Sequence, residues 1–460
     1  MESNLSVKEV NKTAILLIAT LATFLTPFMG TSLIIALPTI AKDLTVNAIL
    51  LSWISTAYIL TSAMFAVPFG KIADIYGMKK IFTYGIVILT ISTLLAAISP
   101  SAEFLVVTRA VQGIASAMIF VTGLAIITSV FPSQERGKAI GINITAGYVG
   151  LVMGPVLGGF LTQYLGWRSV FYFIVPLCLM VLVLVIWKMK GEWGECKGEK
   201  LDNWGTLLYI LMLALVLIGF STITETWGMV MVILGIIGFI GFVLWELRVE
   251  NPVLEVKLFF KNRRFAFSNL ATLISYISTF AVSFLLSLYL QYIKGFDPRI
   301  AGLILVVQTV IMVFMSPVAG KLSDRFDPGK LASLGMAIIT IGLLILSFIS
   351  DATSLYVIIL ALAIIGLGIG IFSAPNTNAI MGSVERKYFG VSSAILSTMR
   401  LLGQTFGMGL ILVIFVVYIG AVQFTPQNYP DLLTSIKVTF IISVILSVIA
   451  VFASLARNRK

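Results

Sequence analysis

Residues 70–80 read GKIADIYGMKK, and residues 320–324 repeat the first five positions as GKLSD. Each copy follows a long apolar run and places a glycine, a lysine and an aspartate where that run ends. Glycine lets two helix ends approach closely, and an aspartate charge is favourable at a helix N-terminus. We therefore expect Asp74 to lie where a helix begins, with Lys79 and Lys80 holding the turn on one side of a membrane.

Other features recur at nearly the same spacing. Residues 135–137 (ERG) have a counterpart in residues 385–386 (ER), and the glycines of 150–154 (GLVMG) have one in 403–407 (GQTFG). The chain thus resembles two copies of one six-helix unit. Such duplications are typical of transporters, in which one half rocks against the other around a site near the membrane midplane.

Composition requires a membrane protein. Of the 460 residues 59% are hydrophobic and 11% are charged, whereas soluble proteins carry about 25% charged residues. Fourteen apolar segments are long enough to cross a bilayer, which takes about 18 residues or more. They run roughly over residues 13–38, 48–69, 80–99, 103–130, 137–163, 169–188, 204–223, 228–246, 265–292, 299–320, 331–350, 353–379, 389–419 and 434–455.

These spans predict an all-α protein with two six-helix bundles, at 1–190 and 251–460, and residues 191–250 between them. The middle segment would hold a cytoplasmic linker and two inserted helices, expected at the side of the bundles with no assigned role. Lys and Arg gather in loops on the side of the N-terminus, so we expect a multi-pass protein of the cell membrane with both termini cytoplasmic. This placement explains the net charge of +11 without a nucleic-acid partner. Loops of the other side hold only Lys42, Arg168, Lys294, Arg299 and Lys437.

Several enzyme classes are excluded. The chain has no histidine and two cysteines, so a histidine-based triad, proton relay or metal site cannot form. A nucleotide-binding glycine loop followed by Lys-Ser or Lys-Thr is missing from the sequence. We expect no enzymatic activity, no metal and no cofactor, and energy supplied by a gradient if any is used.

Two spans carry further motifs. Arg109 and Gln112 lie within the fourth span, where a charged residue is a functional candidate, although Arg109 could instead extend to the membrane surface. In the fifth span, Gly150, Gly154 and Gly158 recur every four residues and form one smooth stripe. Pro155 would bend that helix. The stripe indicates either a gate or a general close-packing face.

Together these motifs resemble the major facilitator superfamily. The loop at 70–80, the Arg-x-x-Gln-Gly motif at 109–113 and the glycine-proline motif at 147–159, which marks antiporters in that superfamily, carry the resemblance. The Trp-Arg-x-x-Phe stretch at 167–171 and the segment 251–265 are similar to the 14-span drug:proton antiporters. The resemblance implies a secondary transporter, expected to be a monomer in the bilayer, that exports small amphipathic compounds in exchange for protons.

The sequence departs from that subgroup in the first span. Met29 stands where the subgroup carries an aspartate suspected of proton coupling, and we expect all 20 Asp and Glu residues in loops or near helix ends. Glu225 is the coupling candidate. Arg109 and Arg400 have three readings: as braces held by carbonyls and amides, as attractors of an anionic or zwitterionic substrate, or as partners of a carboxylate that reaches in from an edge. The second reading implies a carrier or uniporter for such a metabolite.

The family's fold places the substrate cavity among eight central helices. Polar side chains there can contact substrate, bond to another helix or face lipid. Substrate contacts are expected at Tyr58, Gln112, Tyr148, Gln308, Arg400 and Gln404. Gating roles are expected at Asp74, Arg109, Gly150, Gly154, Pro155, Gly158, Asp324 and Arg325.

Overall fold

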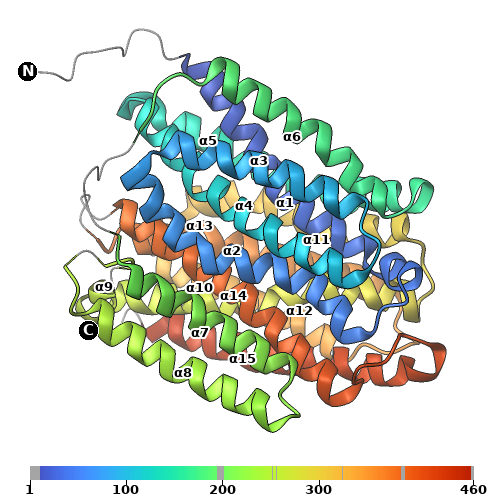
Figure 1. Cartoon of the computed structure of the whole chain (residues 1–460). Coiled ribbons are helices and arrows are strands. Elements are labelled where there is room, and N and C mark those ends of the chain that lie inside the picture. The colour runs from blue at the N-terminus through green and yellow to red at the C-terminus, as the bar shows by residue number, and fades with distance from the viewer. Residues whose placement is uncertain are drawn as a thin grey trace, which may run out of the picture.

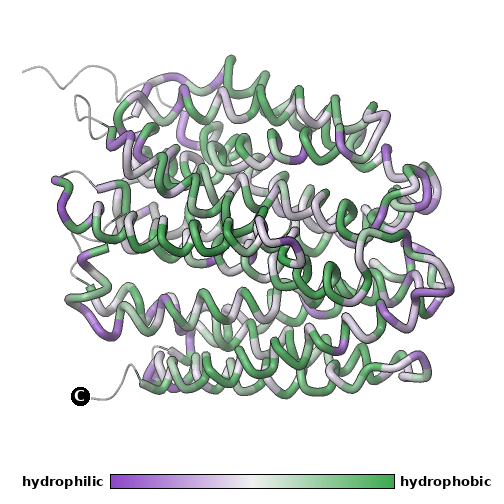
Figure 2. Tube along the Cα trace, turned by 60° about the horizontal axis from the view of Figure 1, so that its bottom comes forward, coloured by the Kyte–Doolittle hydropathy of each residue, from purple (hydrophilic) through white to green (hydrophobic). Residues whose placement is uncertain are grey.

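The computed structural model describes residues 11–193, 201–250, 252–254, 256–323, 325–384 and 389–456. In that part of the chain, fourteen helices are long and apolar enough to cross a membrane. They lie side by side with their polar residues at the two ends of the bundle and their apolar residues between (Figures 1 and 2). The chain is therefore a multi-pass membrane protein, and the all-helical fold expected from the sequence is confirmed.

The helices follow the apolar segments and commonly extend beyond them. The spanning helices are α1 (Lys12–Asp43), α2 (Ala48–Tyr76), α3 (Met78–Ala97), α4 (Ala102–Val130), α5 (Ser133–Leu165), α6 (Arg168–Lys188), α7 (Asn203–Ser221), α8 (Thr226–Glu246), α10 (Arg263–Leu288), α11 (Pro298–Ser323), α12 (Pro328–Ser347), α13 (Leu355–Met381), α14 (Phe389–Tyr418) and α15 (Tyr429–Ala456). A short helix, α9 (Lys257–Lys261), precedes α10, and a π-helical turn, η2 (Tyr289–Ile293), follows it.

The two sets of six helices pack in the same pattern. In the first set α1 packs on α5, α2 on α4, and α3 on both α4 and α6. In the second set α10 packs on α14, α11 on α13, and α12 on both α13 and α15. The sets meet through α5 with α11 and α2 with α14. This is the arrangement of two six-helix bundles, here called the two halves.

The two inserted helices have different environments. Helix α7 contacts both α2 and α14, so it lies along the seam between the halves. The Tyr209 hydroxyl donates to the Ala63 carbonyl of α2 at 3.1 Å, and Phe220 packs so closely on Gly409 of α14 that an added Cβ would lie 2.6 Å from its ring. Helix α8 is outermost (Figure 1). Contact with both halves gives α7 a packing role that the sequence did not indicate.

The bundle has two chemically different ends. At one end the described chain begins with Asn11 and finishes with Ala456. We call it the basic end, because lysines gather there around the loop at 77, in the segment 189–193 and in α9 (Figure 1). The opposite end holds the loops at 44–47, 98–101, 294–297 and 419–428.

Candidate functional site

Arg109 is buried inside the first half without a carboxylate among its hydrogen-bond partners. It is 1% exposed, its Nε donates to the Ile54 carbonyl at 3.2 Å, and its Nη1 donates to Gln112 Oε1 at 2.7 Å. The guanidinium also lies 4.2 Å from the centre of the Tyr58 ring, a distance at which the ring's electrons attract a cation. A carbonyl, an amide and an aromatic face thus hold the charge, as the first of the three sequence readings describes.

In this conformation the side chains of Tyr58 and Gln112 form hydrogen bonds within the cluster around Arg109. The Tyr58 hydroxyl donates to Ser116 Oγ at 2.9 Å, and Gln112 Nε2 donates to Thr93 Oγ1 at 3.1 Å. Both residues are buried, with Gln112 fully so. They join α2, α3 and α4 around Arg109. Contact of either residue with a substrate stays a prediction.

The glycine stripe of α5 packs against α1 of the same half. A Cβ added to Gly150 would lie 2.5 Å from the Phe24 carbonyl oxygen, and one added to Gly158 would lie 2.7 Å from the Ser32 Cα. Gly154 is equally tight against α1. The stripe therefore brings α1 and α5 into backbone contact within one half, so any gating role would act through α1. That role stays a prediction.

The other half meets α5 through different positions. Gly302 of α11 sits directly on the Pro155 carbonyl, and a Cβ on Gly159 would lie 2.6 Å from the Pro298 carbonyl oxygen. Side chains at 302 or 159 would separate the two helices. Backbone contact between α5 and α11 thus closes the opposite end of the bundle.

Two arginines reinforce the opposite end. Arg299 of α11 donates from Nη1 to the Tyr164 hydroxyl of α5 at 2.9 Å, which joins the two halves. Arg168 of α6 makes an ion pair with Asp43 of α1 at 2.7 Å within the first half. The side chains of Arg168 and Asp43 are partly exposed, as is that of Arg299, and Tyr164 is exposed.

The halves also meet where α1 crosses the end of α10. Ser287 Oγ donates to the Ile34 carbonyl at 2.9 Å, and Gln291 Nε2 donates to the Ile35 carbonyl at 3.0 Å. These donors are neutral side chains on α10 and η2, and the acceptors are backbone atoms of α1. The sequence analysis did not select either residue, since neither is charged and neither belongs to a recognised motif.

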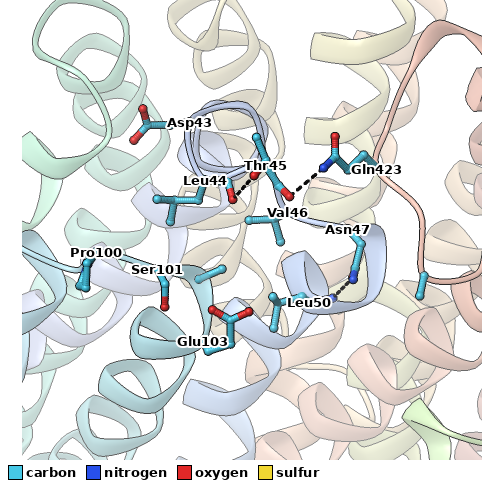
Figure 3. Close-up of a pocket in the computed structure, with 12 residues that line it drawn as sticks. Asp43, Leu44, Thr45, Val46, Asn47, Leu50, Pro100, Ser101, Glu103 and Gln423 are labelled. Atoms are coloured by element: carbon cyan, nitrogen blue, oxygen red, sulfur yellow. Dashed lines mark hydrogen bonds between the residues drawn. The ribbon is translucent and has the colours of Figure 1, made fainter.

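A third contact joins the loop after α1 to the segment before α15. The Ala48 N–H donates to the Val422 carbonyl at 2.9 Å, and Gln423 Nε2 donates to the Thr45 carbonyl at 2.9 Å (Figure 3). Beside it lies a cleft of about 470 Å³ at the surface of the opposite end. The cleft is lined by Asp43, Leu44, Thr45, Val46, Asn47, Leu50, Pro100, Ser101, Ala102, Glu103, Ala421 and Gln423.

At the basic end, the loop 70–80 is shaped differently from the sequence expectation. Helix α2 continues to Tyr76, so Asp74 lies in the last turn of α2 and not at the start of a helix. Gly77 turns the chain with φ +115°. The acid at the start of α3 is Glu192, whose Oε1 accepts the Lys79 N–H at 2.8 Å. A carboxylate from the segment after α6 therefore caps α3. The expectation that Asp74 lies at a helix start was wrong, because hydropathy marks the apolar core and not the helix end. The gating role of Asp74 stays a prediction.

The second copy of this loop is only partly described. Asp324 lies outside the described residues, and Arg325 follows α11 with its side chain exposed. Their gating roles stay predictions.

The second half contributes a polar face toward the basic end. Arg400 of α14 donates from Nη2 to Thr377 Oγ1 of α13 at 3.2 Å, while its buried Nε has no partner among the described residues. Gln404 lies one turn further along α14 and is half-buried, as is Tyr148 of α5. The Oε1 of Gln308 on α11 is likewise buried without a described partner. Unused polar atoms of this kind are available to a ligand, although substrate contact stays a prediction for all four residues.

Acidic residues do not occupy the middle of any described span. Each described Asp or Glu lies in a loop or a terminal helical turn. Met29, which replaces the expected aspartate, is buried. Glu225 is exposed at the link before α8, and Glu246, a buried acid, accepts the Leu254 N–H at 2.9 Å at the basic end of α8. The third sequence reading, an edge carboxylate paired with Arg109, is not found among the bonds of Arg109.

Comparison with known proteins identifies the family of this chain and several of its relatives. The family model described as "Major Facilitator Superfamily" matches residues 19–200 and 268–460. The riboflavin transporter RibZ of Clostridioides difficile is 32% identical over 86% of this chain and 86% of its own length. The multidrug resistance protein Stp of Mycobacterium tuberculosis is 28% identical over 82% of this chain and 71% of its own. The multidrug transporter MdtP of Bacillus subtilis is 27% identical over 87% and 75%.

Solved structures show the same fold. A bacterial homologue of the human lysosomal transporter Spinster, described as inward-facing and unoccupied, superposes with a TM-score of 0.71 at 17% identity and covers 97% of each chain. The nucleoside transporter NupG superposes with a TM-score of 0.64 at 13% identity.

Proposed function

We infer that this chain, which belongs to the major facilitator superfamily, is a secondary transporter that exports small amphipathic compounds from the cell in exchange for protons. One similar protein is named a multidrug resistance protein and another a multidrug transporter. The observation that carries the proposal is the pairing of two like six-helix halves that are held together at one end. Such a pair can expose a central site to one side at a time by rocking.

The orientation follows from charge. Lysine and arginine concentrate at the basic end, and the positive-inside rule assigns that end to the cytoplasm. The contacts between α5 and α11, and between α1 and α10, would then close the pathway to the outside. Export would require these contacts to break while the basic end closes.

Arg400 favours a second candidate, a carrier or uniporter for an anionic or zwitterionic metabolite. A cation exporter coupled to protons needs an acid for which proton and substrate compete, and burial adjusts the pKa of such an acid. The described spans offer no acid at mid-depth. They offer instead the guanidinium of Arg400 with an unused Nε and the amide of Gln308 with an unused Oε1. RibZ, the relative named a riboflavin transporter, adds an uncharged comparison probe, since riboflavin carries no charge near neutral pH but is rich in hydrogen-bond acceptors that a guanidinium can contact.

Flux in sealed vesicles separates the two candidates. The purified protein is reconstituted, a pH gradient is imposed, and a cationic dye, an organic anion and riboflavin are tested one at a time. Dye movement driven by the gradient supports proton antiport. Movement of the anion that is indifferent to the gradient, and that Arg400→Gln lowers while the exposed control Arg248→Gln leaves it unchanged, supports the carrier. Riboflavin that moves in the same way extends the carrier to uncharged polar solutes. Failure of all three probes to move would contradict both candidates for these solute classes.

A further inference from the structure

The contact between α1 and α10 uses a backbone carbonyl that a proline sets free. In a helix, each carbonyl accepts the N–H four residues later. Pro38 lies four residues after Ile34 within α1 and has no N–H. The Ile34 carbonyl therefore lacks its usual partner, and Ser287 Oγ from the other half donates to it at 2.9 Å.

Gln291 completes the network. Its Nε2 carries two N–H groups, of which one donates to the Ile35 carbonyl at 3.0 Å and the other to Ser287 Oγ at 3.1 Å. The Ser287 hydroxyl donates its one hydrogen to the Ile34 carbonyl, so each donor of the two side chains has an acceptor. Ser287, Ile34 and Ile35 are buried, which makes an unmatched donor or acceptor costly here.

The π-helical turn at the end of α10 points neighbouring residues toward α1. The Lys294 N–H bonds to the Tyr289 carbonyl five residues earlier, at 3.0 Å, which marks the wider turn of a π-helix. Because this turn holds more residues, Gln291 and the next residue, Tyr292, both reach α1. The Tyr292 hydroxyl donates to the Pro38 carbonyl at 3.4 Å. Single π-turns of this kind are frequent at functional sites.

A small enclosed space lies beside the network, between the same two halves. Its volume is about 20 Å³, enough for roughly one water molecule. It is lined by Thr31, Ile34, Ile35, Pro155, Ser283, Leu305 and Thr309. The shared residues Ile34 and Ile35 show that the network borders a space that would become wet if the halves separated. Water could then replace the bonds, so opening carries little penalty.

We propose that Ser287 and Gln291 form a latch that holds the opposite end closed, with the carbonyls that surround Pro38 as its receptor. The proposal rests on the proposed function only in that the two halves move relative to each other. It assigns gating to residues outside the sequence motifs. It also gives Pro38 a specific task, which is to leave a carbonyl open for the other half.

Distances between the halves test the latch without any transport substrate. Nitroxide labels are placed on Gln163→Cys at the end of α5 and Ser354→Cys before α13, both exposed at the opposite end. The native Cys178 and Cys196 are replaced by alanine, and double electron–electron resonance gives the distribution of label distances. A second pair, on Lys80 and Lys330, reports the basic end in the same way.

The expected change follows from the number of bonds lost. One side-chain hydrogen bond between membrane helices shifts an equilibrium roughly threefold, so the double variant Ser287→Ala/Gln291→Ala should raise the open-to-closed ratio at the opposite end about tenfold. Pro38→Ala supplies an N–H that competes for the Ile34 carbonyl, and should raise the ratio about threefold. Distances at the basic end should shorten in step.

Two controls isolate the latch. Ser283→Ala removes a hydroxyl one turn earlier on α10 that makes no described bond to α1. Pro176→Ala removes an exposed proline from α6. Both control variants should give the same distributions of label distances as the parent protein. The latch is overturned if the double variant and Pro38→Ala, each monodisperse in detergent, give the parent distributions, or if the controls shift as far as they do. If the distances shift but no probe moves in the vesicle assay, the latch stands and the proposed function fails.

Discussion

The Arg109 cluster makes a strong prediction, because Gln112→Leu should destabilise the protein more than the removal of both partners. Gln112 provides the shortest bond to the buried guanidinium, at 2.7 Å. Leucine leaves the charge in place and removes this acceptor. The double variant Arg109→Met/Gln112→Leu removes the charge together with the acceptor and keeps apolar volume at both positions.

The magnitudes follow from the bonds. A hydrogen bond to a charged group contributes about 1.5–3 kcal/mol, and a neutral one about 1 kcal/mol. Gln112→Leu loses the bond to Arg109 and the bond to Thr93, so it should cost about 2.5–4 kcal/mol. The double variant loses the neutral bond with Thr93, the bond from Arg109 to the Ile54 carbonyl and the cation–aromatic contact with Tyr58. It no longer buries a charge, however, and such replacements are often close to neutral. We expect a cost of about 1–2 kcal/mol.

Thermal unfolding of the purified protein tests this order. The seven tryptophans provide a fluorescence signal, and one fixed scan rate makes the apparent Tm values comparable even if unfolding is irreversible. The expected ranking is parent, then double variant, then Gln112→Leu. Gln404→Leu is the matched control, since Gln404 is half-buried and has no described partner, and it should change Tm little. A double variant less stable than Gln112→Leu would refute the argument that a stranded charge causes the loss.

Three further outcomes are expected. Gly302→Val should push α11 away from the Pro155 carbonyl and lengthen the label distances at the opposite end, whereas parent-like distances would contradict the role of this contact. Glu192→Ala should uncap α3 by removing the acceptor of the Lys79 N–H, and lower stability by about 0.5–2 kcal/mol, measured as a fall in Tm that Glu192→Gln largely avoids. Glu225→Gln should leave flux and its pH dependence unchanged because Glu225 is exposed; loss of gradient-driven flux in this variant would support the sequence-based prediction that Glu225 is the coupling acid.

The spans were predictable because the bilayer imposes a length and an apolar composition that hydropathy records directly. The helix ends were less predictable. Hydropathy places the end of the second span near residue 69, yet α2 continues through Asp74 to Tyr76. Backbone hydrogen bonds do not stop where the hydrocarbon stops, and Gly77 with its positive φ ends the helix instead. The cap from Glu192 depends on a contact between distant segments, which no local pattern reveals.

The functional residues were likewise only partly predictable from the sequence. Arg109 could be selected from sequence because a charge inside a span is rare, but its contact with Tyr58 depends on how α2 and α4 cross. Ser287 and Gln291 were missed, although two signals were present. Pro38 indicates that a carbonyl inside an apolar span lacks its helical N–H partner. Serine and glutamine four residues apart share one helix face. Only the packing of α1 on α10 connects these signals.

The distribution of strong and weak bonds in the molecule agrees with motion between the halves. Charge-assisted bonds around Arg109 lie within the first half, where loss of a partner would cost several kcal/mol and the bundle must stay rigid. Between α1 and α10 the bonds are neutral, and at about 0.6 kcal/mol each the three together contribute about 2 kcal/mol. Arg299 does bridge the halves, but at the partly exposed rim where solvent weakens it. Two states that exchange must lie within a few kcal/mol of each other. A buried ion pair across the halves would exceed this range, whereas neutral donors on open carbonyls hold the end closed and still let it open.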